Sequence, residues 1–387
     1  MTTTFINGIQ NTSEFLDGND TLHVIGSLQL TSGTAIVVNG TLNLCVIAGS
    51  VLTGGGQGMS MFGQNNVVSI LEGGILSQSN SAQTGTALYM AEGSGLLVEN
   101  AGTITGAYGV YFDMAITDSI LVNAGRITGT YYASNNGAGF TSAAAGTLVE
   151  NAGAISGRSY GVNVAGNDTR FVNDGRIAGN VGVLVGAKAE MTLDNAGVIV
   201  GRGGTAIDSG GSLKLTNSGL IHGDVKLGAG SQTYAAAGEG RVLGVVSGEG
   251  GGDILRGARA ADTLAGGGGN DVLRGGRGDD VLRGGEGGDI LAGGRDDDML
   301  TGHGGSDTFV FNRRAGEDEI TDFQNGKDKV DLSAFTISNV SKLVSSGALA
   351  SDGSGGSMID LDRIGGDGLV LIADMALGQW DNGDFVF

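Results

Sequence analysis

Residues 171–223 read FVNDGRIAG, NVGVLVGAKAEMT, LDNAGVIVG, RGGTAIDSGGSLK and LTNSGLIHG, so one nine-residue pattern occurs three times at a spacing of 22 residues. The pattern occurs three more times upstream. Its asparagine stands at Asn100, Asn123, Asn151, Asn173, Asn195 and Asn217. In every copy an apolar residue lies two positions before the asparagine, glycines lie two and six positions after it, and isoleucine lies four positions after it. A unit this short cannot enclose a core, so each copy must bury its apolar residues against its neighbours.

This arrangement predicts a parallel β-solenoid in which the isoleucines stack as an interior ladder about 4.8 Å apart and the glycines form corners. The segments YGVYF, YGVNV, VGVLV and GTAID predict a further short strand in each coil. VSILEGGILS, LCVIAGSVLTG and TLHVIGSLQL are diverged upstream copies. We interpret the asparagine column as a structural ladder that hydrogen-bonds coil to coil, and the stretch TYYASNNGAGFTSAAAG at 130–146 as a loop insertion.

The period shortens to nine residues over 248–310, which read GEGGGDILR, GARAADTLA, GGGGNDVLR, GGRGDDVLR, GGEGGDILA, GGRDDDMLT and GHGGSDTFV. These segments follow G-G-x-G-x-D-x-U-x, where U is a large apolar residue, and are similar to the calcium-binding nonapeptides of the repeats-in-toxin (RTX) family. The resemblance implies a calcium-binding parallel β-roll. Calcium takes about 6–8 oxygen ligands and one aspartate supplies at most two, so backbone carbonyls at the glycine turns must supply the rest.

Two nonapeptides complete one coil, so the aspartates of alternate repeats should line opposite edges. The predicted metal ligands are Asp253, Asp271, Asp289 and Asp307 on one edge and Asp262, Asp280 and Asp298 on the other. The repeat of Asp262 lacks two of the glycines and fits the pattern worst. We interpret Asp279, Asp296 and Asp297 as residues that tune the local charge, and His303 as an exposed turn residue.

The composition restricts the partners. Lys and Arg number 21 against 41 Asp and Glu, which gives a net charge of −20. Such a chain repels nucleic acid and anionic membrane surfaces and attracts divalent cations. It contains no apolar run near ~20 residues, so no membrane span is expected, and the opening MTTTFINGIQNT shows no Sec-type signal. The single cysteine, Cys45, is expected to be a buried apolar residue.

The segment after the repeats points to a route of export. DEITDF and GKDKVDLSAF are similar to the segment that follows calcium repeats in serralysin-type proteases and other type I secreted proteins. The final DFVF resembles the terminal signature that type I secretion transporters read, although the edge strand of a cap would look similar. The resemblance covers 248–387 and implies secretion by a type I transporter to an extracellular location, with association with the cell surface as one outcome.

The predicted fold is therefore all-β, a parallel β-solenoid (β-helix) that continues into a calcium-binding β-roll with a small C-terminal β cap. Residues 1–227 form the β-helix, 228–247 a transition coil, 248–310 the β-roll, and 311–387 the cap and secretion signal. In the transition coil, GAGSQTY resembles a decayed nonapeptide with Gln232 in the place of the aspartate.

The sequence contains neither HExxH nor G-x-S-x-G, which disfavours a zinc protease and a lipase. We expect a non-enzymatic structural, adhesive or surface-layer (matrix) protein that folds on calcium and self-assembles as an oligomer, filament or layer. The alternative is a protein that binds or modifies an extracellular polysaccharide, as a lyase or epimerase does. Two pairs of arginines, each pair in one coil column, and several tyrosines would serve it: Arg126 and Arg176, Arg158 and Arg202, and Tyr108, Tyr111, Tyr131, Tyr132 and Tyr160. Because Asn180 and other residues interrupt the columns, we interpret them as solvated coil surface.

Overall fold

The computed structural model describes residues 2–6, 9–10, 12, 14–30, 33–79, 85–131 and 137–387. The chain forms two compact units: unit 1 comprises residues 1–214 and 219–223, and unit 2 comprises residues 215–218 and 224–387. The fold is all-β, as predicted, and α1 (Val340–Ser346) is the one α-helix of the described part of the chain. No helix in these ranges is long and apolar enough to cross a membrane.

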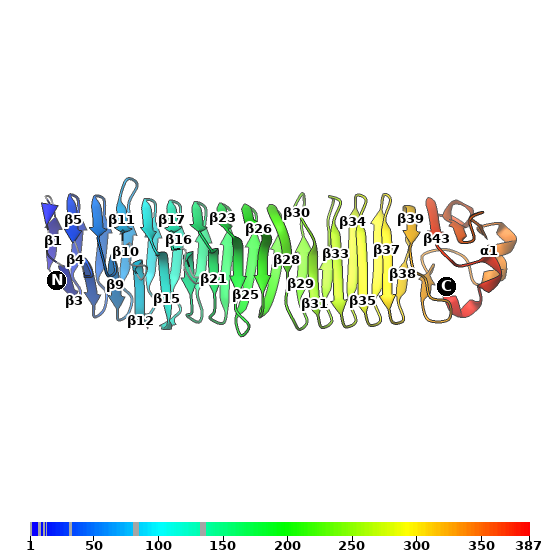
Figure 1. The fold of residues 1–387 in the computed structure, drawn as a ribbon, viewed down its shortest axis with the longest axis horizontal. Helices are drawn as coiled ribbons and strands as arrows, with labels where there is room; N and C mark the ends of the chain where they lie inside the picture. The colour runs from blue at the N-terminus through cyan, green and yellow to red at the C-terminus, as the bar shows by residue number, and fades with distance from the viewer. Residues whose placement is uncertain are drawn as a thin grey trace. The chain divides into compact units, whose positions relative to one another are not determined.

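Unit 1 is a parallel β-solenoid in which each coil contributes one strand to each of three ladders. The first ladder contains β1 (Thr3–Ile6), β4 (Thr21–Val24), β7 (Leu44–Ile47), β10 (Val67–Ile70), β13 (Leu97–Asn100), β16 (Ile120–Asn123), β19 (Leu148–Asn151), β22 (Thr169–Asn173) and β25 (Glu190–Asn195). The second contains β2 (Ile9–Gln10), β5 (Ser27–Leu30), β8 (Ser50–Thr53), β11 (Ile75–Gln78), β14 (Thr103–Gly106), β17 (Arg126–Gly129), β20 (Ala154–Gly157), β23 (Arg176–Gly179) and the first half of β26 (Val198–Ser209). Successive coils lie side by side from blue to green in Figure 1.

The third ladder completes each coil. It contains β3 (Glu14–Asp17), β6 (Ile36–Asn39), β9 (Met59–Phe62), β12 (Thr86–Ser94), β15 (Tyr108–Thr117), β18 (Ala138–Ser142), β21 (Tyr160–Val164), β24 (Val181–Val185) and the second half of β26. The strands predicted from YGVYF, YGVNV, VGVLV and GTAID belong to it. Two further strands, β27 (Ser212–Asn217) and β28 (Leu220–Lys226), contain residues of both units.

The interior of unit 1 is built from stacked apolar residues, as the 22-residue pattern predicts. In the second ladder Ile127 pairs in register with Ile104 and Ile155, and none of the three is exposed to solvent. The upstream copies continue the same columns, since Val51 and Leu76 are equally buried. Each coil therefore closes its core only by contact with the coils on either side.

The asparagine column is a buried ladder of side-chain amides, which confirms its structural interpretation. The Asn100 Nδ2 atom donates to Asn123 Oδ1 at 2.7 Å, and Asn123 donates in the same way to Asn151 at 2.7 Å. The chain of amides continues from Asn151 to Asn173 at 2.7 Å and from Asn173 to Asn195 at 2.6 Å. All five side chains are buried, so hydrogen bonds to the asparagine of the next coil replace the hydrogen bonds that each amide would make with water.

The single cysteine is buried, as expected. Cys45 lies in β7, and burial raises the pKa of its thiol to about 12, in keeping with an unreactive apolar residue.

The loop interpretation of 130–146 is wrong for its second half, because Ala138–Ser142 forms β18 and pairs with β15 and β21. Phe140, fully buried, fills the place that Val110 occupies in the previous coil. Residues 132–136, which include Tyr132, lie outside the described part.

Unit 2 winds with two parallel ladders, and each nonapeptide supplies one strand. The first ladder contains β29 (Thr233–Ala236), β32 (Ile254–Arg256), β34 (Val272–Arg277), β36 (Ile290–Arg295), β38 (Thr308–Val310), β40 (Lys329–Asp331) and β44 (Phe385–Val386). The second contains β30 (Arg241–Leu243), β31 (Val246–Gly250), β33 (Thr263–Gly268), β35 (Val281–Glu286), β37 (Met299–Gly304), β39 (Gly316–Ile320) and β43 (Gly368–Ile372). These strands run from light green through yellow to red in Figure 1. The large apolar residue of every nonapeptide is fully buried.

The C-terminal part closes the roll with a small cap. Two antiparallel strands, β41 (Leu349–Ser351) and β42 (Ser357–Asp360), extend the second ladder beyond β43. The helix α1 and three short 3-10 turns at Leu361–Ile364, Leu377–Gln379 and Asn382–Asp384 complete it. The last strand, β44, pairs in parallel with β40, and the tilted rings of Trp380 and Phe385 lie in contact with centroids 5.0 Å apart. The DFVF ending is thus part of the folded cap.

Candidate metal centre

All seven predicted metal ligands occupy the same place in their repeats, at the turn directly before a strand. The residue after each aspartate starts the strand, and the apolar residue two positions after it points into the core. Their side chains are buried, with 1–3% of their surface exposed: Asp253, Asp262, Asp271, Asp280, Asp289, Asp298 and Asp307. Carboxylates are seldom buried to this degree unless a partner compensates for the lost hydration.

The aspartates form two ladders, one along each edge of the roll, at the predicted spacing of 18 residues. On the first edge the backbone N–H of Asp253 donates to Asp271 Oδ1 at 2.7 Å, and that of Asp271 donates to Asp289 Oδ1 at 2.8 Å. The series continues from Asp289 to Asp307 at 2.8 Å. On the other edge Asp262 donates to Asp280 at 2.7 Å, and Asp280 donates to Asp298 at 2.8 Å. One oxygen of the carboxylate therefore holds the preceding coil at Asp271, Asp280, Asp289, Asp298 and Asp307.

Three residues that were not predicted as ligands extend these ladders. The N–H of Gln232 donates to Asp253 Oδ1 at 2.6 Å, so Gln232 holds the position before the first aspartate. At the far end, Asp307 donates to Asp328 Oδ1 and Asp298 donates to Asp318 Oδ1, both at 3.0 Å. The sequence signal is the D-x-U triplet, DEI at 318–320 and DKV at 328–330. It was missed because these aspartates follow at 20 and 21 residues rather than 18.

The second carboxylate oxygen has no partner at six of the seven positions. The Oδ2 atoms of Asp253, Asp271, Asp280, Asp289, Asp298 and Asp307 are buried, and none accepts a hydrogen bond from any described residue. A buried polar atom without a partner costs roughly 1–3 kcal/mol, and a charged one more. Six such atoms in two regular rows are the arrangement that a row of bound cations would satisfy.

Glycine keeps the space around each free oxygen open. A Cβ atom built on Gly266 would overlap Asp271 Oδ2 and lie 2.6 Å from the carbonyl oxygen of Gly284, which belongs to the next coil. At Gly284 the same construction overlaps Asp289 Oδ2 and comes within 2.9 Å of the Gly302 carbonyl oxygen. A carboxylate oxygen and a carbonyl oxygen thus border one small cradle. Because calcium takes oxygen ligands of both kinds, the residues present fit this ion.

The turns that carry these carbonyls need glycine for a second reason. Gly285 and Gly287 have φ of 122° and 120°, in the left-handed region that other residues avoid. The repeat of Asp262 has alanine at both of these positions, and neither alanine adopts a positive φ. There, Asp262 Oδ2 accepts a hydrogen bond from the N–H of Ala258 at 3.2 Å. The site that fits the pattern worst is therefore also the one whose carboxylate is already satisfied.

Burial sets the electrostatics of the ladders. It raises the aspartate pKa values from the ordinary 3.8 to about 6 for Asp253 and Asp289, about 7 for Asp298 and Asp307, and about 8 for Asp280. Loss of hydration is the largest cause, the hydrogen bond from the preceding backbone N–H opposes it, and neighbouring carboxylates add to it. A bound cation would reverse this shift by stabilising the charged form.

Side chains alone do not build the site. Within the described ranges no three His, Cys, Asp or Glu side chains come close enough together to hold a metal ion. A bound calcium ion would therefore take most of its ligands from backbone carbonyls. Asp296 and Asp297, expected to tune the local charge, accept backbone hydrogen bonds from Gly278 at 2.9 Å and Glu317 at 2.9 Å, and Asp279 accepts one from Asp297 at 3.2 Å. They therefore also fasten neighbouring turns. His303 is exposed, with φ of 66°.

A match to a protein-family model agrees with this geometry. Residues 247–282 and 283–313 match the family model of the RTX calcium-binding nonapeptide repeat (4 copies). No curated protein matches the chain in sequence. Among solved structures, the chain is similar to a subunit of the mannuronan C5-epimerase from Azotobacter vinelandii, with 25% identity over 35% of this chain and 78% of that chain and a TM-score of 0.17. Residues 247–313 therefore carry RTX calcium-binding nonapeptide repeats, and they wind as a parallel β-solenoid.

Proposed function

We propose that the protein leaves the cell unfolded through a type I secretion transporter, folds outside on binding calcium, and acts there as a non-enzymatic structural, adhesive or surface-layer protein. The observation that carries the proposal is the set of six buried carboxylate oxygens without partners. The ligands are the seven predicted aspartates together with turn carbonyls, and the site of Asp262 is the weakest. Where calcium is scarce, as in the cytosol, the charged ladders oppose folding and the chain stays exportable.

The expected affinities are sufficient for such a switch. Extracellular calcium modules bind with dissociation constants of about 0.1–1 mM, so each site adds about 1.4–2.7 kcal/mol at ~10 mM calcium. Several sites in one roll would together match the whole stability of a typical domain, about 5–15 kcal/mol. Calcium binding and folding of unit 2 would then be a single equilibrium.

A calcium titration of the EDTA-stripped protein tests the switch, with far-UV circular dichroism and light scattering recorded in parallel. We expect the β signal to rise over the millimolar range. Magnesium at the same concentrations is the matched control, since it binds reluctantly to all-protein oxygen cages and should have little effect. A β signal that does not respond to calcium would refute the calcium switch.

Self-assembly is the second part of this proposal. Parallel ladders end in strands whose backbone groups are unpaired on one side, and such edges pair readily with other chains. We expect calcium-dependent particles or fibres in negative-stain images and growing scatter during the titration. A protein that stays strictly monomeric at high calcium would contradict assembly and leave a soluble extracellular protein.

The alternative function, binding or modification of a polysaccharide, has an observation of its own in unit 1. Arg158 and Arg202, which the sequence places two coils apart, line one pocket. A lyase or epimerase would also need a general base beside the sugar, and the described lining of this pocket contains no carboxylate or histidine. Release of unsaturated uronates, or an altered epimer ratio, on alginate or pectate would establish an enzyme.

A further inference from the structure

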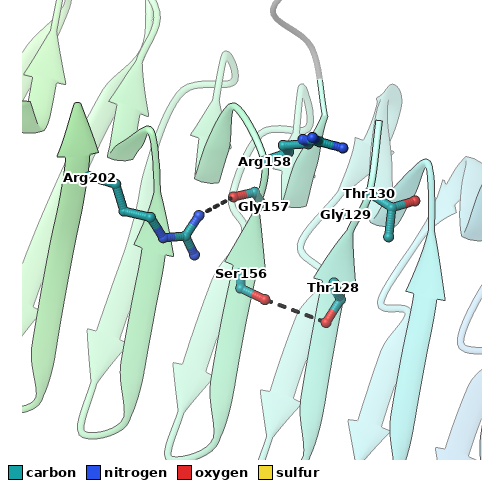
Figure 2. A pocket seen from close by; sticks show the side chains of 7 residues that line it. All are labelled: Thr128, Gly129, Thr130, Ser156, Gly157, Arg158 and Arg202. Carbon is teal, nitrogen blue, oxygen red and sulfur yellow. Dashed lines mark hydrogen bonds between the residues drawn. The ribbon is translucent and has the colours of Figure 1, made fainter. Parts of the chain in front are cut away.

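A shallow pocket of about 270 Å³ lies at the corner of unit 1 where β17 and β20 end (Figure 2). Two arginines, Arg158 and Arg202, and three hydroxyl side chains, Thr128, Thr130 and Ser156, line it. The remaining lining is glycine backbone, so peptide groups rather than side chains form part of its floor. The pocket is therefore polar and open to a large ligand.

The two arginines reach this pocket because one of them spans an intervening coil. The backbone N–H of Asn180 donates to the Arg158 carbonyl, which places Asn180 on the coil between the two arginines. The side chain of Arg202 extends back over this coil, and its Nη1 atom donates to the carbonyl oxygen of Gly157 at 3.4 Å. Figure 2 shows the guanidinium group of Arg202 directed at the carbonyl oxygen of Gly157. Both arginines therefore line the pocket although Asn180 lies between them along the solenoid.

The chemistry of the lining selects an anionic ligand. Guanidinium groups bind carboxylate and sulfate oxygens through paired N–H donors. Both arginines are exposed, and the part of the lining that the structure describes contains no acidic residue, although the chain carries a net charge of −20. Beside them, Thr128 Oγ1 lies 3.4 Å from Ser156 Oγ, a pair that can exchange hydrogen bonds with sugar hydroxyls.

A tyrosine surface adjoins the pocket and indicates that the anion belongs to a sugar. Tyr131 follows Thr130 directly, and its ring centroid lies 6.4 Å from that of Tyr108. The rings continue from Tyr108 to Tyr111 at 6.1 Å and from Tyr111 to Tyr89 at 5.6 Å. All four are half-buried and leave part of each ring accessible. Aromatic rings of this kind offer flat apolar contact area together with a polar hydroxyl.

We propose that this pocket binds the carboxylate or sulfate group of an anionic polysaccharide, whose neighbouring sugars lie over the tyrosine surface of Tyr89, Tyr108, Tyr111 and Tyr131. The guanidinium groups of Arg158 and Arg202 hold the oxyanion, and Thr128 and Ser156 hold hydroxyls of the same sugar. This assignment goes beyond calcium-dependent folding, because it gives unit 1 a ligand. It also requires no reaction at the pocket.

The test uses the calcium-loaded full chain and isothermal titration calorimetry with three probes: short oligogalacturonates, dextran sulfate and neutral dextran. The variant is the double substitution Arg158→Ala with Arg202→Ala. The matched control is Arg176→Ala, which removes an exposed arginine from β23 of the same unit but lies outside the pocket lining. Circular dichroism and a melting curve for each variant confirm that the fold is intact.

We expect binding of at least one acidic probe, weaker binding at ~0.5 M salt, and an affinity loss of about tenfold or more in the double variant. Arg176→Ala should change the affinity less than about twofold. Binding of oligogalacturonates or of dextran sulfate identifies the anion as carboxylate or sulfate. Equal binding of neutral dextran, an equal loss in Arg176→Ala, or no binding of either acidic probe would overturn the proposal. None of these results affects the calcium titration, so the two proposals fail separately.

Discussion

Asp289→Asn should have opposite effects on the calcium-free and the calcium-loaded protein. Asp289 Oδ1 accepts the N–H of Asp271 at 2.8 Å, whereas Oδ2 is buried without a partner. An asparagine keeps the first oxygen and replaces the second with an NH2 group, which can donate a hydrogen bond to the carbonyl oxygen of Gly302. The substitution thus removes a buried charge in the absence of calcium and removes a ligand in its presence.

The magnitude follows from the pKa of Asp289, which burial raises from 3.8 to about 6. The difference of roughly 2 units corresponds to about 3 kcal/mol by which ionisation destabilises the calcium-free fold at pH 7. Asp289→Asn should therefore stabilise the calcium-free roll by up to about 3 kcal/mol. At ~10 mM calcium the variant should lack at least one calcium site, and calcium should therefore stabilise it by about 1.4–2.7 kcal/mol less than it stabilises the unmodified protein.

Urea unfolding followed by circular dichroism measures both quantities, in EDTA and in ~10 mM calcium. If the calcium-free roll is unfolded without urea, an osmolyte that favours the folded state makes its free energy of unfolding measurable. Asp279→Asn, an exposed carboxylate in the same roll, is the control and should change either value by less than about 0.5 kcal/mol. If Asp289→Asn lowers the calcium-free stability, or leaves the gain from calcium unchanged, the assignment of Asp289 as an uncompensated ligand is refuted.

Three further outcomes are expected. In EDTA the roll should gain β signal as the pH falls from 8 to 4, because the folded chain, whose aspartate pKa values are raised to about 8 for Asp280, takes up protons more readily than the unfolded chain. This stabilisation is complete below pH about 4 and is lost as the pH rises through about 6–8. An unchanged β signal would contradict the prediction. Gly284→Ala should reduce the number of calcium ions bound per chain, measured by calorimetry, by about one. Gly268→Ala, whose added methyl group meets nothing within 4 Å, should leave this number unchanged. Asn173→Ala removes two buried hydrogen bonds between side-chain amides and should lower the free energy of unfolding by about 2–3 kcal/mol in urea melts. The control Asn180→Ala, at an exposed position, should change it little.

The repeats explain why so much of the fold could be predicted from sequence. Once a period is recognised, equivalent residues of successive units must stack, so the isoleucine column, the asparagine ladder and the two aspartate edges follow from counting. No such rule identified β18, because Ala138–Ser142 is rich in small residues and resembles a loop. Its place is decided by the neighbouring strands β15 and β21, which bury Phe140 between them.

The site was predictable where the period held and not where it changed. Asp318 and Asp328 continue the ladders, but the two or three additional residues before them break the 18-residue count. The pocket in unit 1 escaped prediction for another reason. A column count locates Cα atoms, whereas the position of the Arg202 guanidinium group depends on a long side chain that crosses Asn180 to reach Gly157.

The constant register of the first ladder has a consequence for how such a protein can change in evolution. Asn100, Asn123, Asn151 and Asn173 stay in register although 23, 28 and 22 residues separate them, so surplus residues enter the connections and leave the strands unchanged. Duplication or deletion of one whole coil would therefore present the same interior to both neighbours. Unit 1 can be lengthened in steps of about 4.8 Å without a new core, which makes it a molecular ruler whose reach is set by copy number.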